Sequence, residues 1–239
     1  MLMDISVSYY SSTGARDNNE DAVFMQECRN GLLAMVADGL GGHDKGEVAS
    51  NMAVSSVSHQ LVNRTPDKDD LVQAIIQANN DISHAQTNGN AMKTTIAAVW
   101  IGNGVGYAAN VGDTRIYQFR NGRIVYQSVD HSVAQISVLV GELSPEDIRT
   151  SPDRNKLIRV LGNEAAPKVD CQKLTVECGD RFLLCSDGFW EPVEETAMIL
   201  AAEGTSDAKT WLEKMKGIIT RAQRRHQDNH TAVAIIISA

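Results

Sequence analysis

The chain contains the stretch LLAMVADGLGGH (residues 32–43), in which six apolar residues lead directly into an aspartate and a glycine-rich turn. A short apolar run bounded by turn residues indicates a buried strand. Asp38 would therefore stand at a rigid strand end, and the glycines after it leave room for carbonyl oxygens and water to approach an ion. Taken alone, the motif is more typical of an ordinary Asp-Gly turn than of an ion site.

Further acidic residues stand beside apolar runs elsewhere in the chain. Asp187 follows the run 182–185, Asp228 leads into the run 231–237, and the cluster Asn19-Glu20-Asp21 precedes another strand-like segment. Carboxylates at several strand ends can bind divalent cations, whose charge offsets the repulsion between them. Because these ligands are hard oxygens without histidine or thiolate partners, the pattern favours Mg²⁺ or Mn²⁺ over Zn²⁺.

Apolar patterning predicts strands in runs and helices in pairs. The expected strands are 2–9, 22–26, 32–37, 94–101, 106–110, 116–119, 124–127, 169–176, 181–185 and 231–238. Helices are expected over 46–62, 193–203 and 206–225, and a further helix is expected to be capped by Thr65 with Pro66 in its first position. That helix presents the apolar stripe Leu71, Ile75, Ala78 and Ile82.

This order of elements predicts an α+β fold in which two antiparallel sheets are flanked by helices, a four-layer α-β-β-α sandwich. A chain of 239 residues with 43% hydrophobic residues can bury one large core, so we expect a single domain over 1–239. Segment 132–167 is expected to form short helical pieces, ending with 157–161, laid over the sheets as a subdomain.

Composition excludes several classes of function. The net charge of -8 argues against a nucleic-acid partner, because binding a phosphate backbone requires a basic face. The densest basic spot, over residues 221–225, is typical of a solvated helix end. Cys28, Cys171, Cys178 and Cys185 form no Cys-x-x-Cys pair and indicate reduced thiols. Residues 1–12 resemble neither a signal peptide nor a membrane anchor, so we expect a cytoplasmic protein without a membrane partner.

Seven motifs now identify a family. They are Arg16-x-x-Asn19-Glu20-Asp21, Asp38-Gly39-Leu40-Gly41-Gly42-His43, Thr94-Thr95, Gly112-Asp113-Thr114-Arg115, Asp130-His131-Ser132, Ser186-Asp187-Gly188 and Asp228-Asn229. In this order and context they resemble the type 2C, metal-dependent protein serine/threonine phosphatases (PPM family), and the chain is similar to the compact bacterial members over nearly its whole length. The resemblance implies a metal site in a cleft at one edge of the sandwich, with segment 132–167 as a flap beside it.

The resemblance also implies ligand roles. Asp38 resembles the bridging ligand, Gly39 a carbonyl ligand, and Asp187 and Asp228 the remaining carboxylates of a two-ion core site that takes Mn²⁺ or Mg²⁺. Glu20 and Asp21 resemble outer groups that hold metal-bound water, for which a plain surface turn is the alternative. Asp113 resembles a ligand for a third, weaker ion, for which a hairpin aspartate is the alternative.

Two residues are expected to serve the reaction directly. Arg16 resembles the family's phosphate clamp, since a guanidinium offers a planar fork of donors to phosphate oxygens; the alternative is an exposed loop arginine. His43 is the candidate acid for the leaving alkoxide, because imidazole titrates near neutral pH. Animal members place histidine directly after Asp-Gly, where this chain has Leu40, so a structural role for His43 stays open.

The implied activity is hydrolysis of protein phosphoserine and phosphothreonine by a metal-activated water. We expect a monomer that acts on phosphorylated proteins and opposes a cognate Ser/Thr kinase. A catalytically inactive binding module on the same scaffold would lack carboxylates, and none is missing. A hydrolase of small phosphoesters shares every catalytic residue, so the sequence does not separate that alternative from protein dephosphorylation, nor does it identify the pathway.

Overall fold

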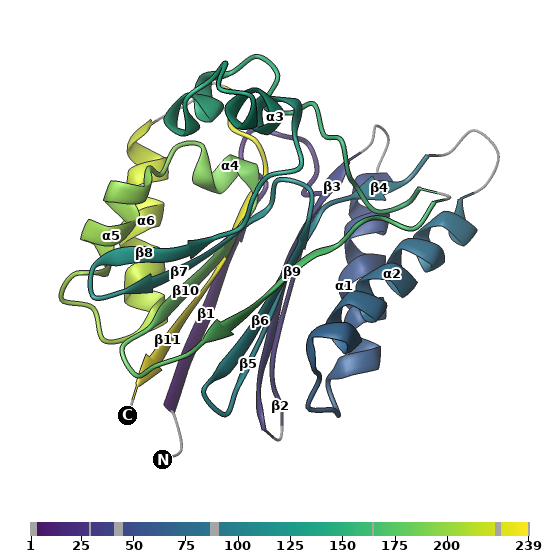
Figure 1. Ribbon diagram of the computed structural model, residues 1–239. Coiled ribbons are helices and arrows are strands. Elements are labelled where there is room, and N and C mark those ends of the chain that lie inside the picture. Colours follow the sequence, from purple (N-terminus) through teal and green to yellow (C-terminus); the bar gives the residue numbers. More distant parts are fainter. Residues whose placement is uncertain are drawn as a thin grey trace.

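The computed structural model describes residues 4–28, 30–40, 45–86, 91–163, 165–222 and 226–238. Within them, two antiparallel sheets face each other and a pair of helices covers the outer side of each sheet (Figure 1). The α+β fold predicted from the order of elements is therefore confirmed, including its four layers. Both chain ends lie at the lower end of the sandwich in this view, opposite the flap.

Each sheet combines strands from distant parts of the chain. The first sheet has the strand order β1 (Asp4–Ser12), β11 (His230–Ser238), β10 (Arg181–Cys185), β7 (Arg115–Arg120) and β8 (Arg123–Gln127). The second has the order β2 (Asp21–Cys28), β3 (Gly31–Leu40), β5 (Ile96–Gly102), β6 (Val105–Val111) and β9 (Asp170–Thr175), and β4 (Lys93–Thr94) pairs with the end of β3.

The unbroken apolar run of β3 is explained by its position in the middle layers. Leu32, Ala34 and Val36 pack between the two sheets. The alternate residues 33, 35 and 37 pack against the helices on the outer side. Because successive side chains of a strand point to opposite faces, both faces of β3 must be apolar. The strand continues past Asp38 to Leu40, so the predicted break into a turn at Asp38 is wrong.

The helices pack in two pairs. The second sheet is covered by α1 (Lys45–Leu61) and α2 (Lys68–Ala85), and the first by α5 (Glu195–Ala202) and α6 (Ala208–Ala222) (Figure 1). Trp211 and Met215 of α6 are fully buried against β10 and β11. Burying side chains of this size stabilises the fold by roughly 1.5–3 kcal/mol each relative to exposure.

The flap lies over one end of the sandwich. It contains α3 (Val133–Leu139) and the 3₁₀-helix η1 (Pro145–Thr150). Residues 157–161, predicted to be helical, are instead extended, since Leu157 bridges to Ser132 and Leu161 bridges to Thr94. The buried Asn79 of α2 accepts a hydrogen bond from the backbone N–H of Gly162 at 2.9 Å, which ties the end of the flap to the helical layer.

Two helix starts differ from the prediction. A short helix α4 (Asp187–Trp190), missed by the sequence analysis, begins where a turn was predicted. In α2 the cap is Asp67 rather than Thr65, and Pro66 lies before the helix. Asp67 accepts from the N–H of Asp70, whose side chain accepts from the N–H of Asp67 in return. This reciprocal capping box satisfies two backbone donors, whereas the hydroxyl of Thr65 accepts a hydrogen bond from Asn30.

No described helix combines the length and the apolar composition that crossing a bilayer requires. The four cysteines are all free thiols, and Cys185 is fully buried in β10.

The capping assignment is tested by Asp67→Ala. We expect the free energy of unfolding in urea to fall by about 1 kcal/mol, since a backbone donor of the first helical turn loses its partner. Thr65→Ala, which removes only the contact with Asn30, should cost clearly less. A larger loss for Thr65→Ala than for Asp67→Ala would contradict this assignment.

Candidate metal centre

Strand register brings the predicted carboxylates to one end of the sandwich. Asp21, the first residue of β2, lies directly opposite Asp38 on β3. In the other sheet the end of β10 pairs with the start of β11, so Asp187 and Asp228 lie just beyond that pair. Asp113 lies in the turn between β6 and β7. In antiparallel sheets the end of one strand lies beside the start of its neighbour, so residues far apart in sequence meet.

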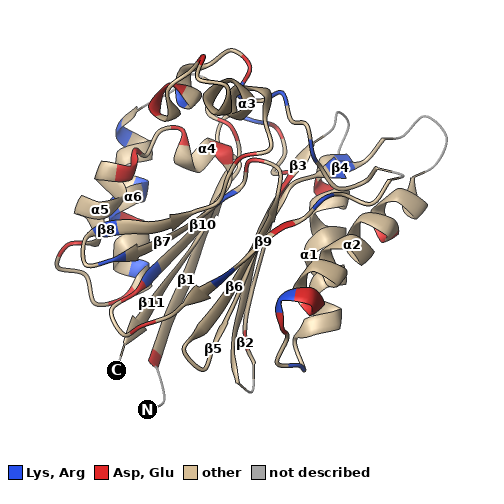
Figure 2. Ribbon diagram, in the orientation of Figure 1, with Lys and Arg blue, Asp and Glu red and all other residues tan. Residues whose placement is uncertain are grey.

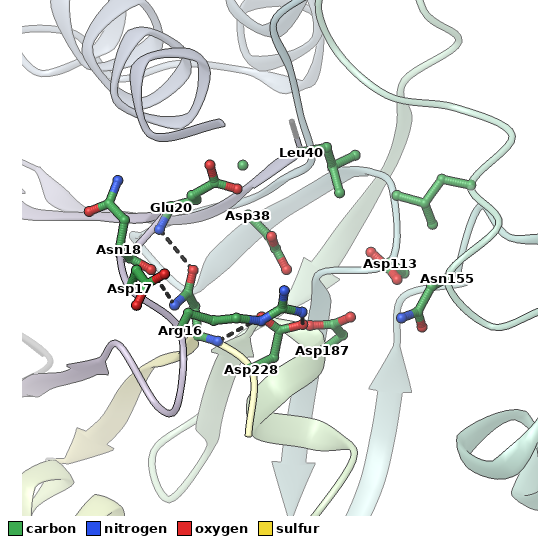
Figure 3. Close-up of a pocket in the computed structure, with 13 residues that line it drawn as sticks. Arg16, Asp17, Asn18, Glu20, Asp38, Leu40, Asp113, Asn155, Asp187 and Asp228 are labelled. Carbon is green, nitrogen blue, oxygen red and sulfur yellow. Dashed lines mark hydrogen bonds and ion pairs between the residues drawn. The ribbon is translucent and has the colours of Figure 1, made fainter. Parts of the chain in front are cut away.

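These residues line a cleft of about 560 Å³ beneath the flap. Figure 2 shows acidic residues around this end of the sandwich, near α4 and the end of β3. Figure 3 shows Asp38, Asp187 and Asp228 directed into a common space. The lining consists of Arg16, Asp17, Asn18, Glu20, Asp38, Gly39, Leu40, Asp113, Asn155, Leu157, Asp187, Asp228 and Asn229. Among these described residues Arg16 is the single cation, so the cleft carries a strong excess of negative charge.

Burial and mutual repulsion raise the pKa of several cleft carboxyls. Burial, followed by the charge of Asp21, raises the pKa of Asp38 well above its usual value. Burial and then the charge of Asp228 raise the pKa of Asp187 to about 7. The pKa of Asp113 is raised well above its usual value by burial and then by Asp187. Positive charge placed among these groups would favour their charged forms.

The donor set fits divalent cations. Asp21 is buried, and its Oδ1 has no hydrogen-bond partner among the described residues, whereas its Oδ2 accepts from the hydroxyl of Ser186 at 2.8 Å. An unpartnered buried carboxylate oxygen that neighbours further carboxylates suits a metal-bound water or an ion. In the described part of the chain no three acidic, histidine or cysteine side chains enclose one point.

The Thr94-Thr95 motif holds the backbone of Asp38. The hydroxyl of Thr95 accepts from the N–H of Asp38 at 3.0 Å, and the N–H of Thr95 donates to the carbonyl of Asp38 at 2.8 Å. The hydroxyl of Thr94 donates to the same carbonyl at 2.8 Å. Lys93, at a position where glycine is commoner, forms with Thr94 the short strand β4 against the end of β3. These hydrogen bonds fix the backbone from which the Asp38 side chain extends into the cleft.

Two glycines allow β3, α1 and the β1–β2 loop to approach closely. A Cβ on Gly39 would lie 2.2 Å from the carbonyl oxygen of Gly46 and 2.6 Å from that of Glu20. A Cβ on Gly46 would lie 2.6 Å from Oε2 of Glu20. The N–H of Gly39 donates to the carbonyl of Glu20 at 3.1 Å. The glycines therefore serve close packing around Glu20 and Asp38.

Arg16 is brought to the cleft but is engaged with a carboxylate. Its guanidinium donates to Asp228 at 2.6 Å, and its side chain is 59% exposed. Asn229, quoted in a motif but given no role by the sequence analysis, positions this loop. Its side-chain oxygen accepts from the N–H of Glu20 at 2.8 Å, and its amide donates to the carbonyls of Thr13 and Asn18.

Comparison with known proteins shows the family of this chain. The family model described as protein phosphatase 2C matches residues 10–227. The chain belongs to the protein phosphatase 2C family. It is 33% identical over 231 residues to the serine/threonine phosphatase stp of Listeria monocytogenes, covering 92% of this chain and 90% of the relative. The predicted family is thereby confirmed.

Solved structures of the family have the same fold. The PPM Ser-Thr phosphatase MsPP of Mycobacterium smegmatis superposes with a TM-score of 0.84 at 30% identity, covering 97% of both chains. The catalytic domain of the serine/threonine phosphatase PstP, solved in complex with two manganese ions, gives a TM-score of 0.84 at 26% identity, covering 99% of this chain and 100% of that one.

Other family motifs serve structure in this phosphatase 2C chain. The two carboxylate oxygens of Asp130 accept hydrogen bonds from Nε and Nη2 of the Arg115 guanidinium. The side chain of Ser132 caps the N-terminus of α3. Nδ1 of His131 accepts from the N–H of Gly112 at 3.1 Å, which supports the turn before Asp113. Burial lowers the pKa of His131. His43, the predicted acid, lies outside the described residues, whereas Leu40 lines the cleft.

The flap contributes cleft residues that sequence reasoning missed. Asn155 and Leu157 line the cleft, and Figure 3 shows Asn155 on the side of Asp113. Only the general match of segment 132–167 to the family's flap pointed to this region, because no local pattern marks individual flap residues as cleft residues. Trp190, to which the sequence analysis gave no role, is buried, and its indole N–H donates to the carbonyl of Asp113 at 3.0 Å.

The close approach at Gly46 is tested by Gly46→Ala. The added methyl group would push against Glu20 and the end of β3, so we expect unfolding stability to fall by about 1–3 kcal/mol. Turnover should fall by roughly a hundredfold, as displacement of catalytic groups by about 1 Å commonly causes.

Gly217→Ala is the matched control for that variant. Its Cβ would meet only Arg221 at 3.5 Å in the interior of α6, so it should gain up to about 1 kcal/mol of stability with unchanged turnover. Normal turnover in Gly46→Ala would contradict the role given to this packing. Chemical denaturation and phosphatase assays of both variants provide the measurement.

Proposed function

We propose that this chain dephosphorylates phosphoserine and phosphothreonine in proteins, with two divalent cations held by the carboxylate cleft. Family membership makes the chain a serine/threonine protein phosphatase, a phosphomonoester hydrolase. The observation that carries the proposed mechanism is the convergence of Asp38, Asp187 and Asp228 in a cleft where burial and mutual repulsion raise the pKa of carboxyls, so that cations would stabilise their charged forms.

Each ligand role rests on position in the cleft. Asp38, the carbonyl of Gly39, Asp187 and Asp228 would hold the two core ions, for which Mn²⁺ and Mg²⁺ are the matching hard cations. Asp113, on the flap side of the cleft, would serve a third ion. Glu20 and Asp21 would hold ion-bound water, a role supported by the free oxygen of Asp21. The Mn²⁺ complex of the PstP domain supports the choice of metal.

When bound, the cations activate a water for in-line attack on phosphorus and offset the charge of the phosphate. Protein side chains would bind the phosphate, position the ligands and donate the proton. Arg16 would leave Asp228 and clamp two phosphate oxygens, an exchange that is feasible because its side chain is largely exposed. Thr94 and Thr95 would keep the backbone of Asp38 in place during the reaction. His43 is proposed as the proton donor to the leaving alkoxide.

Further proposals concern the biological setting. A protein substrate suits a cleft that is open to solvent and bordered by flap residues such as Asn155. A cognate Ser/Thr kinase would supply that substrate, because dephosphorylation requires prior phosphoryl transfer. We further propose that the chain acts as one catalytic domain over 1–239, as a cytoplasmic monomer without nucleic-acid or membrane partners, which agrees with its charge of -8 and its free thiols.

Metal removal tests the proposal. In EDTA, turnover of a phosphothreonine peptide should fall at least about a hundredfold, because several kcal/mol of transition-state stabilisation come from the cations. Re-addition of Mn²⁺ or Mg²⁺ in excess should restore turnover. Circular dichroism recorded on the same samples controls for unfolding. Full turnover of the folded protein in chelator would overturn the two-metal mechanism, and turnover of nitrophenyl phosphate without turnover of the peptide would overturn the protein substrate.

A further inference from the structure

A cluster of charges lies behind the cleft wall, outside the proposed ligand set, with Arg115 and Asp130 buried and Glu195 half-buried. The guanidinium of Arg115 is 4% exposed and forks onto the carboxylate of Asp130 at 2.9 and 2.7 Å. Its Cζ also lies 3.5 Å from the ring centroid of Trp190, a cation–π contact in a desolvated setting. Arg115 is therefore fixed on one edge by a carboxylate and on its face by an indole.

A second arginine reaches this cluster from the flap. Arg149 of η1 pairs with Glu195 of α5 at 2.6 Å, and its Cζ lies 5.4 Å from the Trp190 ring. Glu195 also accepts from the hydroxyl of Tyr117 at 2.9 Å and from Arg115 at 3.4 Å. Although burial acts to raise it, the contact with Arg149 keeps the pKa of Glu195 below its usual value. The positive charges of the two arginines thus balance the negative charges of Asp130 and Glu195.

Trp190 connects this cluster to the cleft. Its indole N–H donates to the carbonyl of Asp113, and Trp190 itself ends the helix α4 that begins at Asp187. One side chain therefore packs against Arg115 on one side and holds the backbone of a cleft aspartate on the other. Movement of the cluster would be transmitted to the turn that carries Asp113.

The same cluster anchors the flap. Five residues after Thr150, the last residue of η1, the chain reaches Asn155, which lines the cleft, and the neighbouring Arg154 pairs with Glu191 at the end of α4 at 2.6 Å. The flap is thus joined to the body through α5 and α4, the two helices that lie below it in Figure 1. The α5 contact leads through Arg115 and Trp190 to Asp113, whereas the α4 contact meets the residue that follows Trp190.

We propose that Glu195 is a positioning residue that couples the flap to the Asp113 turn, through Arg149 on one side and through Arg115 and Trp190 on the other. Its carboxylate uses both oxygens for this purpose, Oε2 toward the flap and Oε1 toward Arg115 and Tyr117. The coupling sets the position of the flap wall, so it governs protein substrates more than small phosphate esters. This inference rests on the proposed phosphatase function.

Glu195→Gln tests the coupling with little change in shape. We expect hydrogen exchange to quicken over residues 145–157 and 112–114. The KM for a phosphothreonine peptide should rise about three- to thirtyfold, the effect usual for residues that couple two sites, with less than about a twofold change for nitrophenyl phosphate. Glu194→Gln is the matched control, because Glu194 is the exposed neighbour on the same helix end and its side chain makes no capping hydrogen bond.

A double-mutant cycle separates coupling from simple loss of stability. Arg149→Gln should reproduce the Glu195→Gln effects, and the double variant should be no worse than either single one. Trp190→Phe, which lacks the indole donor, should quicken exchange at 112–114 and leave 145–157 protected.

Each failure has a distinct signature. Unchanged exchange in Glu195→Gln, additive effects in the double variant, or equal rises in KM for both substrates would overturn the inference while wild-type phosphatase activity stands. Absence of activity in the wild-type protein would instead overturn the proposed function, and the exchange measurements would still test the coupling.

Discussion

The main constraint on this structure is electrostatic, because carboxylates that repel each other and lose hydration are gathered at one end of the two-sheet sandwich. Each sheet delivers its share through register, Asp21 opposite Asp38 in one and Asp187 near Asp228 in the other. Such groups repel each other and lose hydration, which is visible in the raised pKa of Asp38. The arrangement persists because the strands are rigid and buried on both faces, and it becomes favourable when cations bind.

The residues around the cleft are held rigidly, because the carboxylates must stay together despite their repulsion. Backbone groups of Asp38 are held by two threonines, and Glu20 is held by Asn229 and by the close approach of two glycines. Arg16 differs, since it reaches in from an exposed loop and pairs with Asp228. A fixed set of acids and one movable cation are what a phosphate-binding cleft requires, because the ligands must be in place before substrate while the clamp must respond to it.

Local patterns predicted the parts of this site that depend on local structure. Asp38 and Asp187 could be found because each follows an apolar run that indicates a buried strand, although β3 continues two residues past Asp38. The seven motifs then pointed to the family. The helix cap at Asp67 was missed because Thr65, Pro66 and Asp67 are all residues typical of a helix start. The hydroxyl of Thr65 bonds to the distant Asn30 instead of capping the helix, a contact that the local sequence does not reveal. The links from Trp190 to Asp113 and from Arg149 to Glu195 join segments 77 and 46 residues apart, which no local pattern reveals.

The central claim is that the carboxylate cleft is a dinuclear metal site. Anomalous diffraction from crystals grown with Mn²⁺, recorded near the manganese absorption edge, tests it most directly. The account predicts two strong peaks among Asp38, Asp187 and Asp228, with Arg16 released from Asp228. A single peak, or manganese found only outside the cleft in an otherwise ordered and active protein, would contradict it.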